Sequence, residues 1–238
     1  MADANPALPS AELLREQAGW LAPARAWLLR DVAIARRRSV LDLGAGHGAV
    51  TGELQRRSGG RVVALDCAVD ALRGLAGAVG GDARRLPFAD GAFDLVFSQL
   101  TLLWVAPLEP ALDELARVLA PGGALVALEP DYGGLIEHPP EVAARDLWLA
   151  ALPRAGADPL VGRKLPGLLA DRGFDARVRL FDTLVAPAPA RFDFLDDLPL
   201  TPEERARLDE LRFAAAAMTR PWSQVAHLPF MLVMAGWG

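Results

Sequence analysis

A strand that runs directly into three glycines is the feature that most constrains this fold. Ser39–Leu43 is predicted as a buried strand, Gly44, Gly46 and Gly48 follow it, and a helix is expected from Thr51. Glycine lets the backbone turn tightly and lets a ligand approach where a Cβ would clash. Amides at the start of the following helix can face an anionic group. The segment therefore predicts a ligand site at a strand-to-helix turn of an α/β sheet.

Further strands and helices alternate along the chain. Strands are predicted at 61–66, 78–79, 93–98 and 124–129, and helices at 69–76 and 108–119. The strand at 78–79 is weak because only two apolar residues precede Gly80. Strands that alternate with helices indicate a parallel sheet covered on both faces.

The flanking regions add helices and two late strands. Leu, Ala and Trp recur at helical spacing over 11–30, with Ser10 as the N-cap. Helices are also expected near 140–152, near 162–171 and from Thr201, where Pro202 and Glu204 complete a capping box. The late strands at 177–181 and 229–234 predict a mixed edge on the parallel sheet.

An acid at the end of the second predicted strand limits the class of ligand that the site would bind. Gly44, Gly46 and Ala49 fit the pattern G-x-G-x-x-A, and Asp66 lies about 20 residues further on, where an acid that binds ribose hydroxyls belongs. These elements favour an adenosine-containing ligand without naming the cofactor. Two plainer interpretations remain open, a tight turn without a ligand and an ordinary exposed carboxylate.

Four further segments, together with 40–48, distinguish the possible cofactors. They are 81–88, 93–96, 103–104 and 116–123, which ends in Pro-Gly-Gly. In this order they resemble class I S-adenosylmethionine-dependent methyltransferases of the ubiquinone/menaquinone-biosynthesis type (methyltransferase type 11), over about residues 38–130. The resemblance implies a doubly wound, Rossmann-like, seven-stranded, mostly parallel sheet with an antiparallel last strand. We expect one domain, 1–238, made of N-terminal helices (1–37), a cofactor-binding core (38–130) and a helical acceptor cover with sheet-completing strands (131–238).

The same resemblance implies roles for individual residues in binding S-adenosyl-L-methionine and its product S-adenosyl-L-homocysteine. Asp66 would bind the ribose hydroxyls, and Asp82 the adenine amino group. The other cofactor-binding candidates would line the methionine or adenine portions or support the loop: Asp42, Gly44, Ala45, Gly46, Gly48, Cys67, Ala83, Ser98 and Leu100. Cys67 would pack against adenine, although a small buried hydrophobe is the commoner role. Arg15 is a candidate for the cofactor carboxylate, against the plainer interpretation of a solvated side chain.

The acceptor is expected above the carboxyl ends of the strands, under a cover formed by 131–165 and the N-terminal helix. His138 in this cover is the candidate general base for a hydroxyl acceptor, and a surface histidine is the alternative. Four tryptophans could line an apolar acceptor pocket, although a core role is the commoner one: Trp20, Trp27, Trp104 and Trp148. Together with the 52% of hydrophobic residues they favour a small, partly apolar metabolite. The stretch after 93–98 reads Ser-Gln-Leu-Thr and lacks the Asn/Asp-Pro-Pro-aromatic signature of enzymes that methylate exocyclic or amide nitrogen.

Two other functions stay open at this point. A noncatalytic methyltransferase-like module would keep the glycine loop but transfer nothing. A nicotinamide-dependent oxidoreductase would explain the glycines and Asp66 but not the segment around Asp82.

Composition excludes several classes of site and partner. With one cysteine, Cys67, and three scattered histidines, no metal-ligand spacing is present, so no metal is expected. A net charge of −5 argues against general nucleic-acid binding. Charged residues, Gly or Pro interrupt every apolar run before the ~18 residues of a membrane helix. Residues 1–10 lack a secretory pattern, which predicts a cytoplasmic protein, and the preference for Arg over Lys indicates a bacterial genome.

Overall fold

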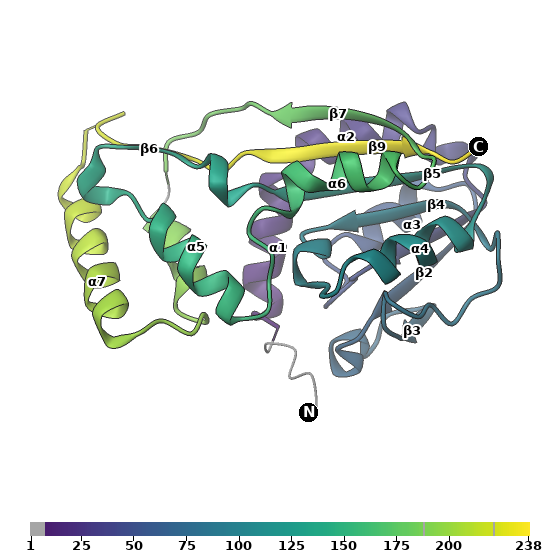
Figure 1. Ribbon diagram of the computed structural model, residues 1–238, viewed down its shortest axis with the longest axis horizontal. Helices are drawn as coiled ribbons and strands as arrows, with labels where there is room; N and C mark the ends of the chain where they lie inside the picture. Colours follow the sequence, from purple (N-terminus) through teal and green to yellow (C-terminus); the bar gives the residue numbers. More distant parts are fainter. Residues whose placement is uncertain (1–7, 188, 221) are drawn as a thin grey trace.

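A seven-stranded sheet forms the centre of the molecule (Figure 1). The computed structural model describes residues 8–187, 189–220 and 222–238. The strands are β1 (Ser39–Leu43), β2 (Arg61–Asp66), β3 (Ala78–Gly80), β4 (Phe93–Gln99), β5 (Leu119–Pro130), β7 (Asp175–Phe181) and β9 (Phe230–Gly236). Their order is β3-β2-β1-β4-β5-β9-β7, and β9 runs antiparallel to both β5 and β7. The predicted doubly wound, mostly parallel sheet is confirmed.

The strand order reverses between β1 and β4. The chain first builds outward from β1 through β2 to β3 and then returns to add β4 and β5 on the other side of β1. Leu43, the last residue of β1, is paired with Leu65 in β2 and with Ser98 in β4. In open α/β sheets, ligands bind outside the carboxyl ends of the strands at such a reversal. The glycine loop 44–48 begins at this position.

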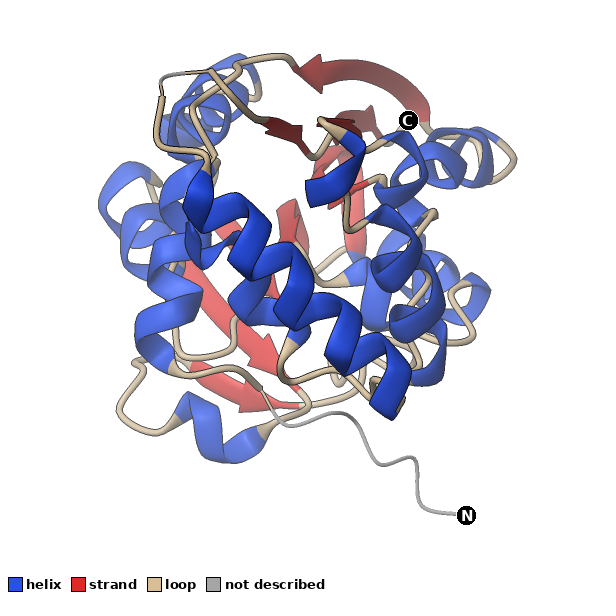
Figure 2. Ribbon diagram, turned by 90° about the vertical axis from the view of Figure 1, so that its left-hand side faces the viewer, coloured by secondary structure: helices blue, strands red, loops and turns tan. Residues whose placement is uncertain are grey.

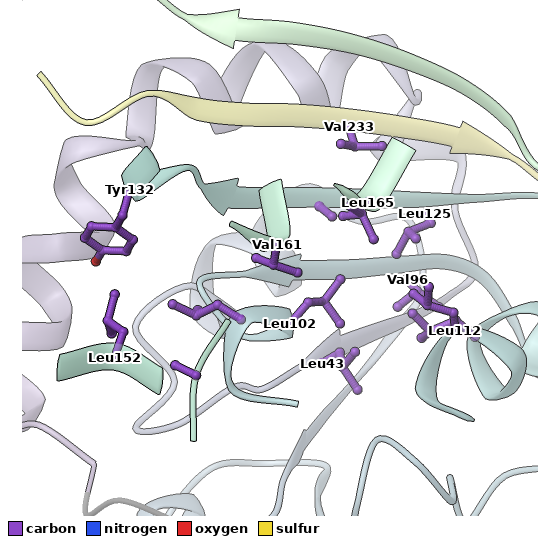
Figure 3. Packing of buried hydrophobic residues seen from close by; sticks show 14 of the residues in the cluster. Leu43, Val96, Leu102, Leu112, Leu125, Tyr132, Leu152, Val161, Leu165 and Val233 are labelled. Atoms are coloured by element: carbon purple, nitrogen blue, oxygen red, sulfur yellow. The ribbon is translucent and has the colours of Figure 1, made fainter. Parts of the chain in front are cut away.

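Two layers of helices enclose the sheet. The helices are α1 (Ala11–Trp20), α2 (Ala22–Asp31), α3 (Thr51–Arg57), α4 (Glu109–Val118), α5 (Arg145–Arg154), α6 (Val161–Ala170) and α7 (Pro202–Ala217). Side chains of successive strand residues point to opposite faces. Val40 therefore packs with α2 and α3, whereas its neighbour Leu41 packs in the cluster that contains residues of α4 and α6. Figure 3 shows the second cluster, in which Leu43, Val96 and Val233 meet side chains of these helices.

A separate group of elements stands beyond the carboxyl ends of the strands. It contains α5, α7, the short helices η5 (Pro140–Val142) and η6 (Pro189–Leu195), and a ribbon of β6 (Ile136–His138) and β8 (Val225–His227). Figure 1 places this group to the left of the sheet with α1 between them, and Figure 2 looks onto it with its helices in front of the strands. We call these elements, together with α1 and the short helix η4 (Tyr132–Gly134), the cover.

Three expected helices differ in the structure. The helix expected over 11–30 is divided at Leu21, because Pro23 in the first turn of α2 cannot donate an amide hydrogen bond back to α1. The helix expected at 69–76 is a single turn, η2 (Val69–Leu72), since Gly74 and Gly77 adopt positive φ. The helix expected near 140–152 begins at Arg145, after a turn opened by the pair Pro139-Pro140.

Two predicted helix caps are confirmed. Ser10 accepts a hydrogen bond from Leu13 N at the start of α1. Thr201 and Glu204 form the expected capping box of α7. Among the described residues, no helix is both long enough and apolar enough to cross a membrane.

Candidate functional site

The glycine loop combines one open position with two crowded ones. Gly44, Gly46 and Gly48 have φ of 73°, 51° and 77°, a conformation that L side chains rarely adopt. A Cβ on Gly44 would lie 2.1 Å from Thr101 Oγ1, and one on Gly48 would lie 2.5 Å from a methyl group of Leu75. A Cβ on Gly46 would meet only a methyl group of Leu14, at 3.6 Å. Gly44 and Gly48 are thus required by packing, whereas Gly46 lines open space under α1.

Asp66 fixes the conformation of this loop. It ends β2 and its side chain is buried. One carboxylate oxygen accepts a hydrogen bond from Gly46 N and the other accepts one from Ala68 N, both at 2.8 Å. Each oxygen keeps further lone-pair capacity, so the carboxylate can still accept from a ligand hydroxyl. The role in binding ribose stays a prediction, and the structure adds a role in holding the loop.

Asp42 lies beneath the loop and joins its two ends. Thr51 Oγ1, at the start of α3, donates a hydrogen bond of 2.6 Å to this carboxyl group. Burial raises the pKa of Asp42 to about 6, and the bond from Thr51 opposes that shift. Asp42 therefore acts on a ligand through the loop that it supports, since its side chain is enclosed.

Asp82 and Ala83 lie after β3, as predicted for the adenine side. The Arg84 guanidinium binds both oxygens of Asp82, at 2.7 to 3.1 Å, and Arg84 N donates a further bond of 2.8 Å. These bonds, led by those from the Arg84 side chain, lower the pKa of the Asp82 carboxyl, so it is ionised at neutral pH. An amino group bound by Asp82 would have to share this carboxylate with Arg84.

A buried glutamate at the end of β5 organises the segment after β4. Glu129 accepts hydrogen bonds from Thr101 N (3.1 Å), Leu102 N (2.9 Å) and Ser98 Oγ (3.4 Å). Burial raises its pKa to about 7, although these bonds oppose the shift. Glu129 thereby fixes Thr101 over Gly44. The signal in the sequence was an acid that directly follows the apolar run 124–128.

Two candidate residues of the predicted cofactor site lie at the surface. Arg15 is exposed on α1. Cys67 is exposed as well, which corrects the interpretation of a small buried hydrophobe, because it directly follows the last residue of β2. Leu100 is half-buried and adopts a φ of 56° between β4 and the Thr101 turn.

A different arginine fastens the N-terminal helices to the core. Arg25 on α2 is buried and donates hydrogen bonds to Glu53 (2.8 Å), Gln99 (2.9 Å) and the carbonyl of Ala18 (2.8 Å). It joins both N-terminal helices to α3 and to the end of β4. The sequence gives no direct signal for this contact, because α2 carries a second arginine, Arg30, and no local pattern distinguishes the two.

The part of the chain that follows β5 contributes aromatic and charged contacts in and next to the cover. The rings of Tyr132 and Trp148 lie 4.8 Å apart, and the carboxylate of Asp131 makes a bidentate ion pair with Arg163 at 2.7 and 2.8 Å. His138 is exposed at the end of β6. The structure thus brings together the glycine loop, Asp42 and Asp66, while His138 belongs to the ribbon of the cover.

Comparisons with known proteins agree with this geometry. Residues 41–127 match the family described as a methyltransferase domain. A demethylmenaquinone methyltransferase of Mycolicibacterium paratuberculosis is 45% identical over 104 residues, which cover 41% of this chain and 44% of that protein. A malonyl-[acyl-carrier protein] O-methyltransferase of Pseudescherichia vulneris is 37% identical over 116 residues, 46% of each chain. The chain thus spans less than half the length of these curated relatives.

Solved structures extend the likeness to nearly the whole chain. A candidate methyltransferase from Bacillus halodurans superposes with a TM-score of 0.64 at 20% identity, covering 89% of this chain and 97% of that one. At that identity the likeness concerns the fold. The sheet order, the glycine loop and the matched segment agree with one another: residues 41–127 carry a methyltransferase domain, and its likeness to class I S-adenosylmethionine-dependent methyltransferases supports S-adenosyl-L-methionine as the cofactor.

Proposed function

We propose that this chain transfers a methyl group from S-adenosyl-L-methionine to a small, partly apolar metabolite. The observation that carries the proposal is the loop 44–48, held open at Gly46 by Asp66 at the reversal of strand order. A ligand at Gly46 would lie between the carboxyl edge of the sheet and Leu14 of α1. The match to the methyltransferase domain over 41–127 supports the same ligand.

The residues of this region fit the cofactor by their chemistry. We infer that the loop residues Gly44, Ala45, Gly46 and Gly48 approach its methionine portion through the backbone, and that Asp66 accepts from its ribose. Asp82 and the Ala83 amide would face adenine, with Cys67 and Leu100 packing beside it. Ser98 and Asp42 act beneath the surface, because both side chains are buried.

When bound, the cofactor supplies a methyl group that its sulfonium makes electrophilic. The chain's own residues then have to position an acceptor in line with that methyl group, and positioning can supply much of the acceleration. The cover does this by enclosing the acceptor, with Tyr132 and Trp148 as an aromatic pair that suits an apolar body. Enclosure also excludes water, which would compete as an acceptor.

A base is needed only where the acceptor holds its proton in water. For a hydroxyl acceptor we propose His138, because histidine is the side chain that most often acts as a general base. It is exposed on β6, so solvent can remove the proton that it takes up.

The two relatives named above differ in acceptor. One is named for demethylmenaquinone and the other for a malonyl group on acyl-carrier protein, and the latter name specifies methylation of oxygen. The matched core therefore carries the cofactor chemistry, whereas the acceptor depends on residues outside 41–127. For this reason the choice of acceptor is assigned to the cover.

Titration calorimetry with S-adenosylmethionine, S-adenosylhomocysteine and NAD tests the cofactor. We expect micromolar binding of the first two and much weaker binding of NAD; tighter NAD binding would favour the nicotinamide-dependent alternative. Formation of S-adenosylhomocysteine from S-adenosylmethionine, measured with each of a panel of apolar metabolites as the acceptor, then tests catalysis. Binding without turnover on any of them would favour the noncatalytic module.

A further inference from the structure

In the part of the cover that the structure describes, Arg191 has an enclosed guanidinium group that makes no hydrogen bond. All three guanidinium nitrogens of Arg191, on η6, are shielded from solvent and form no hydrogen bond with any residue that the structure describes. Nearby arginines of the cover are paired differently, since Arg154 binds Glu204 and Arg212 binds Asp196. Arginine remains protonated in proteins, so Arg191 is a buried charge with unused donors.

The surroundings of Arg191 enclose its guanidinium without giving its N–H groups a hydrogen-bond acceptor among the described residues. Its Cζ lies 4.3 Å from the centroid of the Phe192 ring, so an aromatic ring covers one face of the planar group. The acid that interacts with it electrostatically is Glu137, and burial lowers the pKa of Arg191 despite that charge. The Glu137 carboxylate is occupied elsewhere, because it accepts from Ala144 N and Arg145 N at the start of α5. The N–H groups in the plane of the Arg191 guanidinium therefore make no hydrogen bond to Glu137 or to another described residue.

Arg191 also belongs to the part of the cover that faces the glycine loop. Phe194, on the same short helix, makes an edge-to-face contact with Trp20 at the end of α1, with ring centroids 5.4 Å apart. Leu14, six residues earlier on α1, lies over Gly46. Six residues of α-helix span about 9 Å. Trp20, which contacts η6, therefore lies about 9 Å along α1 from the residue over Gly46.

We propose that Arg191 binds the carboxylate of the methyl acceptor, so that the acceptor is an organic acid with an apolar body. The inference rests on the proposed function and names the class of substrate for that site. The planar fork of guanidinium donors matches a carboxylate in two parallel hydrogen bonds. A carboxylate brings one negative charge to Arg191, whereas a phosphate dianion brings two and is repelled more strongly by the nearby Glu137. The aromatic side chains of Phe192 and Phe194 provide an apolar surface next to the charge.

The irregular chain on either side of η6 provides the route of entry. Residues 182–187 lack regular secondary structure, and residues 196–200 form turns and irregular chain. Because the guanidinium is enclosed, binding of an acceptor there would require η6 to shift from α5 and α7. Binding of the carboxylate then compensates the charge that the closed cover leaves unpaired.

Calorimetry with three matched probes tests the charge preference. The probes are 3-phenylpropanoate, 3-phenylpropanamide and 2-phenylethyl phosphate, each added to the full chain with and without saturating S-adenosylhomocysteine. We expect the carboxylate to bind at least about tenfold more tightly than the amide, because the neutral amide brings no negative charge to the guanidinium. Equal affinities would overturn the proposal, and tightest binding of the phosphate would overturn the choice of a carboxylate.

Two variants test whether Arg191 is the residue that causes this preference for the carboxylate. Arg191→Gln should bind acid and amide equally, whereas Arg207→Gln, which removes an exposed arginine of α7, should keep the preference of the wild type. Arg191→Gln should bind S-adenosylhomocysteine as the wild type does and should melt no lower, since it removes a buried unpaired charge. Arg191→Met is the second variant should the glutamine chain fail to fold. A preference for acid that survives in folded Arg191 variants would overturn the proposal.

The design separates the two hypotheses. Absence of S-adenosylhomocysteine binding contradicts the proposed function, while the probes added without it still report on Arg191. Normal S-adenosylhomocysteine binding with no preference for acid contradicts only the Arg191 subsite.

Discussion

The carboxylate of Asp66 accepts a hydrogen bond from the backbone of Gly46, twenty residues earlier in the chain. This bond joins the end of β2 to the middle of the glycine loop. A residue predicted as a ligand contact is therefore also a structural support of the site. The two roles lead to different measurable losses when Asp66 is changed.

Asp66→Ala should weaken both the loop and the cofactor site. The variant leaves Gly46 N and Ala68 N without their acceptor, which should lower the free energy of unfolding by about 1.5–3 kcal/mol. Separately, loss of the bonds to ribose should weaken the binding free energy of S-adenosylhomocysteine by roughly 1.5–3 kcal/mol. Thermal unfolding and calorimetry measure the two effects. Asp70→Ala, at an exposed aspartate, is the control, and wild-type affinity in folded Asp66→Ala would refute the ribose role.

Gly46→Ala should separate binding from folding. Alanine at a φ of 51° costs about 1–2 kcal/mol in strain, but its methyl group has room beside Leu14. We expect a folded protein whose S-adenosylhomocysteine affinity falls at least about tenfold, because the methyl group occupies the ligand's side of the loop. Gly74→Ala is the matched control, since Gly74 has a φ of 82° and open space around it. It should lose similar stability and no affinity.

Gly44→Ala should instead impair folding. Its Cβ would lie 2.1 Å from Thr101 Oγ1, and Glu129 holds Thr101 in place. Overpacking of this kind typically costs about 1–3 kcal/mol. A melting temperature equal to that of Gly74→Ala would show that Thr101 can move aside.

The buried Glu129 should make stability depend on pH. Its pKa is raised from 4.5 in the unfolded chain to about 7 in the folded protein, so the folded state holds the proton more tightly. Its contribution is fully present below pH 4.5 and is lost as the pH rises towards 7. Relative to Glu129→Gln, which stays neutral, the wild type should lose about 3 kcal/mol between pH 4 and pH 8. Denaturant unfolding at several pH values measures this difference, and parallel profiles would show that Glu129 titrates normally.

His138→Ala tests the proposed base. With a hydroxyl acceptor, turnover should fall by about a hundredfold or more while S-adenosylhomocysteine affinity stays unchanged. His227→Ala, on the neighbouring strand of the ribbon, is the control and should keep its turnover. Unchanged turnover in His138→Ala would leave positioning as the account of catalysis.

Features set by local sequence could be predicted well. The turn at 44–48 follows from glycines after a buried strand, and the capping box of α7 follows from Thr201 and Glu204. The order of the sheet follows from alternating strands and helices together with the resemblance to known methyltransferases. In each of these cases the information lies within a few neighbouring residues or in a repeated pattern.

Features set by distant contacts could not be predicted. The strands of the ribbon β6–β8 have three residues each and pair across about 90 positions, too short a pattern to stand out. Arg25 and Arg15 look alike in sequence, yet only Arg25 faces Glu53 and Gln99. Arg191 is buried because η6 packs against α5 and α7, which no local pattern encodes. Charged side chains were therefore the hardest to place, since their burial depends on tertiary partners.

The position of α1 bears on the kinetics of ligand exchange. Leu14 lies over Gly46, while α2 is anchored to the core by Arg25, and fully buried Leu21 joins the two helices. Under the proposed function, a ligand enclosed at the loop would leave only when α1 moves away from it, and Leu21 is the joint at which such a movement would occur. Release of S-adenosylhomocysteine would then set an upper limit on turnover, whatever the speed of the chemical step. Substitutions that loosen the joint at Leu21 would raise that limit.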